Sequence, residues 1–330
     1  MSVRAMCLAA IAAFLLAACA GGSTPGPLSA VPTGPLAQQR TTGGEAPMPF
    51  VELANLDYSN GTITVYHVRN GAAKEFARFT PSGSGAQGLA IDTQGLIYTT
   101  ITSGQGKPCD TCIAVYAPDG RLVATQSAPI LPGAKNAPFL TDVSVDKYDD
   151  IYVSDFGQQA VYFYPGLTSI AAPPTIVAQN SPNAASVLAM PNGNRVFVSG
   201  GCGFASVRPY TASGFRQYQP GSCFGIGTIA LIGAAADDTQ DILTPIDGAP
   251  GLVSISSPAG GRFFAVPDPL GSISGIALSG DGETAYVADH HNESVYVYAR
   301  PAKGWLQSGR PKLLQTFTGF KNLDIIAAKP

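Results

Sequence analysis

The sequence predicts an all-β fold, namely a six-bladed β-propeller with four strands in each blade. Three observations lead to this prediction: a strand pattern that recurs roughly every 40–50 residues, a composition rich in turn-forming residues, and two chain ends that complete one another. Of the 330 residues, 38 are glycine and 27 are proline, while charged residues make up only 12%. This balance is typical of many short strands that are joined by tight turns.

The recurring unit begins with a short apolar strand. We expect these first strands at 89–92, 143–146, 187–190, 229–231, 276–279 and 325–327. The residues just before them, at intervals of 42 to 54, are Gly88, Asp142, Ser186, Thr228, Gly275 and Asp324. A two-sheet sandwich would not repeat one strand order in this way.

A turn rich in glycine, asparagine and aspartate follows the first five of these strands, and such residues supply the positive φ of tight hairpins. A second apolar strand comes next, as at 151–154, and a third strand follows that ends near a tyrosine. We expect third strands of this kind at 113–116, 161–164, 207–210 and 295–298. A fourth, more polar strand completes each unit.

The two ends of the domain together supply the sixth blade. The chain stops after one first-type strand at 323–327, and the domain begins with strands at 51–54, 63–66 and 75–79. Pairing the C-terminal inner strand with the N-terminal outer strands closes the ring and removes the exposed edges that favour aggregation. The fourth blade is the most irregular, because residues 234–248 break the pattern.

Three segments resemble the NHL-repeat and gluconolactonase-like six-bladed propellers. They are Gly-Leu-Ala-Ile-Asp at 88–92, Ile-Tyr-Val-Ser-Asp at 151–155 and Tyr-Val-Ala-Asp at 286–289, each followed by a strand such as 295–298. The resemblance extends over nearly all of residues 50–330. It implies an architecture and not a chemistry, because propellers carry many unrelated functions.

The first residues predict export. Arg4 supplies a short positive region, and the apolar run at 9–16 is too short to span about 30 Å of hydrocarbon. The string Leu-Ala-Ala-Cys at 16–19 resembles the lipobox of bacterial lipoproteins, which implies cleavage before Cys19 and a lipid on its thiol. By the same resemblance, the absence of acidic residues at 20–21 favours the outer membrane. The alternative is an ordinary secreted protein with an unrelated cysteine.

Residues 20–49 are rich in small residues and proline and show no apolar periodicity. Such a segment buries too little surface to offset its ordering entropy, so we expect a disordered tether. Its root-mean-square span is on the order of 30 Å. The expected organisation is a signal peptide at 1–18, a lipidated cysteine with its tether at 19–49, and a propeller at 50–330.

The signal peptide and the lipid account for two of the six cysteines, which leaves Cys109, Cys112, Cys202 and Cys223. An even number in an oxidising compartment predicts two disulfides among three possible pairings. Cys202 and Cys223 lie in two kinds of loop that share one face of a propeller, so we favour a Cys202–Cys223 bond and a Cys109–Cys112 bond. The alternative is a redox or zinc Cys-x-x-Cys motif, which here lacks a βαβ context and a second pair.

Four aspartates recur at one place in the unit. Asp57, Asp155, Asp247 and Asp289 each lie six residues before the first apolar residue of a third strand. At that place a carboxylate can accept hydrogen bonds from backbone N–H groups of the following turn. We interpret the four as turn-forming residues, although they also lie on the face that carries propeller ligand sites.

The residues that open the first strands ring the central tunnel. Asp142 and Asp324 are the acidic members, and Ser186 and Thr228 add hydroxyls. Such groups could hold Ca²⁺, another divalent metal or a polar ligand. The gluconolactonase-like enzymes hold a divalent metal in this region with glutamate, asparagine and aspartate, but no glutamate opens a first strand here.

Two histidines follow Asp289 on the same face. His290 and His291, beside Glu293, could bind a metal or act as a general base. Adjacent residues usually point to opposite sides, so a solvated loop is the simpler interpretation. The Asp289–His290 pair remains a candidate for a ligand or a metal.

Function follows from the sequence only as alternatives. We expect a cell-envelope lipoprotein whose propeller binds an envelope protein, a peptide or a glycan. The alternative is a metal-dependent, lactonase-like hydrolase or a lyase at the tunnel mouth, and a purely structural component is a third hypothesis. The chain has 19 basic and 22 acidic residues and no basic patch, which argues against nucleic acid as a partner.

Overall fold

The computed structural model describes residues 50–81, 85–102, 109–179, 186–190, 193, 195–199, 204–207, 216–217, 235–236, 241–245, 251–257, 260–268, 270–306 and 310–329. Within these ranges the chain forms 24 strands and one short 3₁₀ helix at Leu167–Ser169. No helix in the described part of the chain is long and apolar enough to cross a bilayer. The fold of this part is therefore all-β, as predicted.

The described strands form six antiparallel sheets of four strands each. From the innermost strand outward, the sheets are β4 (Ala86–Ile91), β5 (Ile97–Ile101), β6 (Cys112–Tyr116) and β7 (Leu122–Ser127); β8 (Leu140–Val145), β9 (Ile151–Asp155), β10 (Ala160–Tyr164) and β11 (Thr175–Gln179); β12 (Ser186–Ala189), β13 (Arg195–Ser199), β14 (Phe204–Val207) and β15 (Arg216–Gln217); β16 (Ala235–Ala236), β17 (Ile242–Pro245), β18 (Leu252–Ser257) and β19 (Gly260–Ala265); β20 (Ile273–Leu278), β21 (Thr284–Asp289), β22 (Ser294–Ala299) and β23 (Lys312–Phe317); and β24 (Ile325–Ala328), β1 (Val51–Asp57), β2 (Thr62–Arg69) and β3 (Ala72–Phe79).

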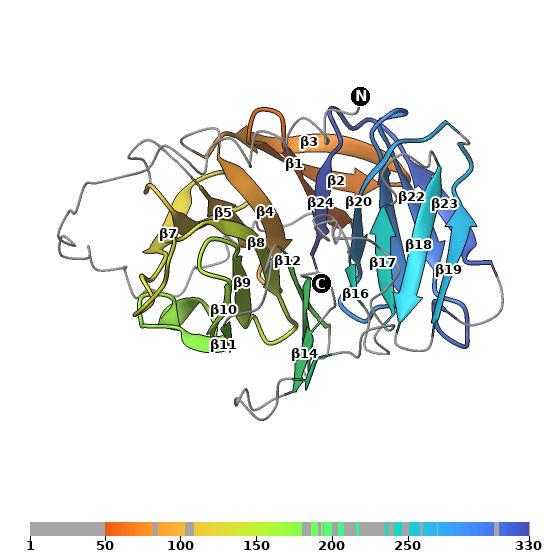
Figure 1. Cartoon of the computed structure of the whole chain (residues 1–330). Helices are drawn as coiled ribbons and strands as arrows, with labels where there is room; N and C mark the ends of the chain where they lie inside the picture. The colour runs from red at the N-terminus through yellow and green to blue at the C-terminus, as the bar shows by residue number, and fades with distance from the viewer. Residues whose placement is uncertain are drawn as a thin grey trace. The chain divides into compact units, whose positions relative to one another are not determined.

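The sheets are arranged around a central cavity. The innermost strands are neighbours in the order β4, β8, β12, β16, β20 and β24, and β24 is again next to β4. All six contribute to the lining of one cavity of about 130 Å³. Figure 1 shows these strands toward the middle of the molecule, with β7, β11, β19 and β23 at the outside. Four-stranded sheets around a central channel are the arrangement of a β-propeller.

The sheet that joins the two chain ends confirms the predicted closure. β24 pairs antiparallel with β1 over Leu53↔Ala328 to Leu56↔Ile325. β2 and β3 then complete this sheet, which we call the closing sheet. Because β24 is its innermost strand, the first and last described strands are hydrogen-bonded to each other.

The hydrophobic core lies between the sheets. Leu56 and Ile63 of the closing sheet belong to the same buried cluster as Ile97 and Ile101 of the next sheet. On its other face, Leu53 belongs to a cluster that extends into the sheet of β20–β23. Both faces of a sheet are therefore buried, which explains why these strands read as nearly continuous apolar runs.

Two predicted strands differ from the structure. The first strand expected at 229–231 lies outside the described residues, and β16 at Ala235–Ala236 pairs with β17 in its place. Of the third strand expected at 207–210, only Val207 is described, as the last residue of β14, which pairs with β13 from Phe204 onward.

Three residues that were predicted to come just before the first strands lie inside those strands. β4, β8 and β20 each begin two residues before Gly88, Asp142 and Gly275, respectively, and the register shifts next to each of these residues. These three residues therefore lie at β-bulges within the strands. A bulge changes the direction of the neighbouring side chains, which brings Asp142 toward the next sheet.

Removing residues 323–330 should abolish cooperative folding. Leu323, Ile325 and Ile326 are almost fully buried, and each such side chain contributes about 1.5–3 kcal/mol. The free energy lost with these side chains and with the unpaired edge of β1 approaches the total stability of a typical domain, about 5–15 kcal/mol. Thermal unfolding monitored by the fluorescence of the single, buried Trp305 measures this. Removal of residues 329–330 alone is the control, and a wild-type transition in the longer truncation would contradict the closure.

Candidate functional site

One end of the sheets gathers most of the predicted site residues. Each innermost strand starts at this end, and each second strand runs antiparallel to it and finishes there. We call it the opening end. Asp57, Asp155 and Asp289 are the last residues of β1, β9 and β21, so they lie at the opening end.

These aspartates form turns, as predicted. Asp57 Oδ1 accepts hydrogen bonds from the backbone N–H of Ser59 (3.0 Å), and Asp155 Oδ1 accepts from that of Gln158 (2.9 Å). Asp289 Oδ1 accepts from the N–H of His291 at 3.0 Å. The fourth member, Asp247, lies outside the described residues.

In two sheets the turn aspartate also holds a buried tyrosine. Tyr162 donates its hydroxyl to Asp155 Oδ2 at 2.8 Å, and Tyr296 donates to Asp289 Oδ2 at 3.2 Å. The tyrosine is seven residues after the aspartate and lies on the third strand of the sheet. The aspartate thus connects the turn with the face of the neighbouring strand.

A second aspartate–tyrosine pair, at the other end of the sheets, was missed by the sequence reasoning. Asp92 and Asp146, in the turns after β4 and β8, accept hydroxyl hydrogen bonds from Tyr98 (2.9 Å) and Tyr152 (3.0 Å). The shared spacing of six residues is the signal that could have revealed both pairs.

Asp142 connects two neighbouring sheets, and burial perturbs its carboxyl strongly. Its Oδ1 accepts from the N–H of Val143 at 2.9 Å, while its Oδ2 accepts from the Ser186 hydroxyl and from the N–H of Val187 at 3.1 Å. Burial raises the pKa of Asp142 to about 7, although these hydrogen bonds oppose the increase. This carboxyl therefore keeps its proton to a higher pH than an exposed aspartate does.

The sheets approach so closely here that the opening residues cannot all be large. A Cβ atom on Gly88 would lie 2.7 Å from the Cα of Asp142, and one on Gly275 would lie 2.5 Å from the carbonyl oxygen of Asp324. Asp324 Oδ2 accepts from the N–H of Tyr58 at 3.2 Å. Thr228 lies outside the described residues.

The predicted metal candidates are spread over this end rather than gathered. His290 Nδ1 lies 2.5 Å from the carbonyl oxygen of Leu323, and His291 Nδ1 lies 3.2 Å from Asp268 Oδ2. The two adjacent histidines therefore have different partners, as their positions in sequence suggested. Within the described residues, no three histidine, cysteine, aspartate or glutamate side chains come together as a metal site.

The closing sheet carries a polar pocket at the opening end. Its cavity of about 340 Å³ is lined by Asn55, Asp57, Asn60, Thr62, Thr64, Arg78, Phe79, Thr80, Lys321 and Asn322. Strand register places these side chains in two rows across β1, β2 and β3. One row is Asn55, Thr64 and Arg78, and the other is Asp57, Thr62 and Thr80.

The pocket lies beside Thr64, at a position where two sheets have a tyrosine and two others have Ala114 or Ser254. Register places Thr64 of β2 where Tyr162 lies in β10 and Tyr296 lies in β22, two residues beyond the partner of the turn aspartate. In those sheets the phenol occupies the space beside the aspartate. The closing sheet has a smaller side chain there, and Asp57 instead holds Ser59 and Asn60.

Of the pocket residues, sequence reasoning identified only Asp57. A usable signal was present, because both faces of a propeller sheet are normally buried against neighbours. Polar residues at 55 and 57 on β1 and at 62 and 64 on β2 interrupt the apolar pattern on one face. The approach of Lys321 and Asn322 follows from the predicted pairing of the chain ends.

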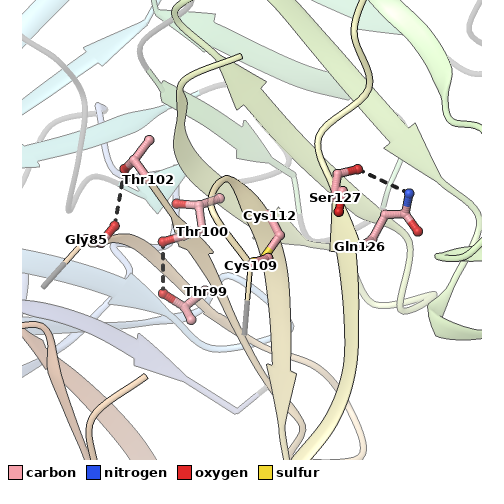
Figure 2. The surroundings of a disulfide bond; sticks show 8 residues. All are labelled: Gly85, Thr99, Thr100, Thr102, Cys109, Cys112, Gln126 and Ser127. Atoms are coloured by element: carbon pink, nitrogen blue, oxygen red, sulfur yellow. Dashed lines mark hydrogen bonds between the residues drawn. A yellow bond between two sulfur atoms is a disulfide. The ribbon is translucent and has the colours of Figure 1, made fainter. Parts of the chain in front are cut away.

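The predicted Cys109–Cys112 disulfide is present in the structure. Figure 2 shows it beside the Thr102–Gly85 hydrogen bond, in the sheet of β4–β7. Cys112 is fully buried and belongs to the core between this sheet and the closing sheet. Cys202 and Cys223 lie outside the described residues.

The proton on Asp142 predicts a pH dependence of stability. The folded-state pKa of about 7 lies above the ordinary value of 3.8, so the folded chain keeps a proton that the unfolded chain releases. The stabilisation is complete below the ordinary pKa and is lost as the pH rises through about 7. From pH 5 to pH 8 the wild type should lose about 2–4 kcal/mol more than Asp142→Asn. Urea unfolding at both pH values measures this, with the exposed Asp119→Asn as control; equal losses in wild type and Asp142→Asn would contradict the prediction.

Comparisons with known proteins agree with the fold. No family model and no curated protein sequence matches the chain. A chain in the crystal structure of a nidogen–laminin complex has a TM-score of 0.56 and 14% identity, covering 85% of this chain and 98% of that one. Virginiamycin B lyase from Staphylococcus aureus has a TM-score of 0.47 and 9% identity, covering 81% of this chain and 89% of that one. At such identities the first likeness supports the propeller fold alone, and the second adds no argument.

Proposed function

We propose that this chain is a lipid-anchored lipoprotein of the bacterial cell envelope whose six-bladed propeller binds a ligand at its opening end. The polar pocket of the closing sheet is the observation that carries this proposal. Its volume of about 340 Å³ lies within the range of small-molecule sites, roughly 300–1,000 Å³. An envelope glycan, peptide or protein is the kind of partner that such a surface site serves.

The walls of the pocket are held in place before any ligand arrives. Asn55 donates to the carbonyl oxygen of Asn322 at 2.9 Å and accepts from the N–H of Asp324 at 2.7 Å. The N–H of Lys321 donates to the Tyr66 hydroxyl at 3.1 Å. A site with fixed walls loses little conformational entropy on binding, which favours affinity.

Export and anchoring rest on the N-terminal sequence and on two supporting observations. A Cys109–Cys112 disulfide is typical of proteins that fold in an oxidising compartment. In addition, β1 begins at Val51 and reaches the pocket only at its other end, near Asp57. Val51 therefore lies at the end of the closing sheet opposite the pocket. Ala20 and Gly21 favour the outer membrane as the site of the anchor.

The binding role is preferred over metal-dependent hydrolysis because of what Asp142 does. Its Oδ2 accepts two hydrogen bonds from the neighbouring sheet, its Oδ1 accepts one within β8, and its raised pKa favours the protonated form. A metal ligand must be deprotonated, so recruiting Asp142 would break an inter-sheet contact. The resemblance to NHL-repeat and gluconolactonase-like propellers stays a prediction and carries no part of this proposal.

Substitution of Cys19 tests the anchor. Cys19→Ser removes the thiol that the lipid requires, so the protein should move from the membrane fraction to the soluble fraction of lysed cells. Immunoblotting of the two fractions measures the change. Cys7→Ser, within the predicted signal peptide, is the control and should leave the protein with the membrane. Membrane association of Cys19→Ser would contradict the proposal.

Filling the pocket tests the binding role. Thr64→Tyr installs the residue that the sheets of β8–β11 and β20–β23 already have at this position, so the fold should tolerate it and the hydroxyl can reach Asp57. Binding to immobilised envelope glycans and peptides should fall by at least about tenfold, since a filled site loses most direct contacts. Thr316→Tyr, an exposed position on β23, is the control. Equal binding by both variants would contradict a role for the pocket.

A further inference from the structure

We infer that the pocket of the closing sheet takes a saccharide that carries a carboxylate or a phosphate group, an inference that rests on the proposed function and specifies its ligand. Two cationic side chains, Arg78 and Lys321, contribute to the lining, against one carboxylate, Asp57. The pocket therefore has a positive balance in a chain whose net charge is −3.

The single carboxylate of the pocket is already occupied. Asp57 accepts from the N–H and the hydroxyl of Ser59, and from the side-chain amide of Asn60 at 2.8 Å. These contacts use both of its oxygens, so Asp57 stabilises the turn, and the donors around it offset its repulsion of an incoming anion. What the pocket offers a ligand is chiefly donor groups.

The cations are available to a ligand. Lys321 is exposed, and no described residue accepts a hydrogen bond from its ammonium group. Arg78 pairs with Glu75 at 2.8 Å, but both side chains are more than 40% exposed. Solvent and salt weaken such a surface pair, so the guanidinium can turn toward a ligand anion at little cost. Its planar group of donors suits a carboxylate or a phosphate.

The remaining lining favours a sugar over a peptide. The hydroxyls of Thr62 and Thr80 lie 3.0 Å apart, and Thr64 and Asn322 line the same cavity. Groups that both donate and accept match the hydroxyls of a pyranose. Phe79 is the single aromatic residue and the only apolar residue that lines the pocket, so apolar peptide side chains have almost no complementary surface there.

Binding of matched sugars to the full-length protein in detergent tests the inference. The probes are D-glucuronic acid, D-glucose 6-phosphate, neutral D-glucose and the dipeptide Ala-Ala, measured by saturation-transfer NMR at millimolar concentrations. We expect the two acidic sugars to bind at least about tenfold more tightly than glucose, since a charge-assisted hydrogen bond is the main difference. Added salt should reduce this preference.

Charge-neutral variants identify the cations. Lys321→Gln and Arg78→Gln should each reduce the affinity for the acidic sugars by about tenfold and leave the weak binding of glucose unchanged. Lys312→Gln, an exposed lysine on β23, is the control and should bind like the wild type. Losses in Lys312→Gln as large as in Lys321→Gln would indicate diffuse surface charge and overturn the inference.

The outcomes separate this inference from the proposed function. Equal binding of glucose and the acidic sugars, lost in Thr64→Tyr, would overturn the requirement for an anion while leaving the binding pocket established. Tighter binding of Ala-Ala would overturn the saccharide. Failure of all four probes would overturn the inference, whereas the proposed function is decided by Thr64→Tyr against Thr316→Tyr on glycans and peptides.

Discussion

The hydrogen-bonded pairing of β24 with β1 is the constraint on which the rest of the structure depends. A propeller sheet has apolar residues on both faces, so it is stable only between two neighbours. The closing sheet supplies one neighbour to the sheet of β4–β7 and one to that of β20–β23, and it does so only while the last strand stays paired with the first. Four residues of each strand, Leu53 to Leu56 and Ile325 to Ala328, carry this pairing.

One polar arrangement recurs in three of the described sheets. A carboxylate at the end of the second strand caps the turn, and in two sheets it also holds a tyrosine that fills the space toward the neighbouring sheet. Burying a polar group without partners is costly, so the aspartate and the phenol stabilise one another only as a pair. The closing sheet keeps the aspartate and lacks the phenol, and the pocket lies where the phenol would be.

The sequence predicted the strand order, the closure and the turn aspartates because each depends on local pattern and on spacing. The recurring apolar strands, the turn residues between them and the complementary chain ends can all be recognised in the sequence. The exact strand register was harder to predict, because bulges at Gly88, Asp142 and Gly275 place these residues inside strands. The pocket was missed because it depends on which residues of β1, β2 and β3 lie side by side, and a one-residue change of register would turn Thr64 and Arg78 to the other face.

The comparison of Thr64 with Tyr162 and Tyr296 also helps to distinguish residues that stabilise the fold from residues that form the candidate site. Positions that repeat with the same residue in the same contact serve the fold. The position of Thr64 differs among the sheets, with Tyr162 and Tyr296 in two and Ala114 and Ser254 in two others, and in the closing sheet it lines a cavity. By that argument Asp155 and Asp289 belong to the scaffold, and Thr64, together with Arg78 and Lys321 around it, belongs to the site.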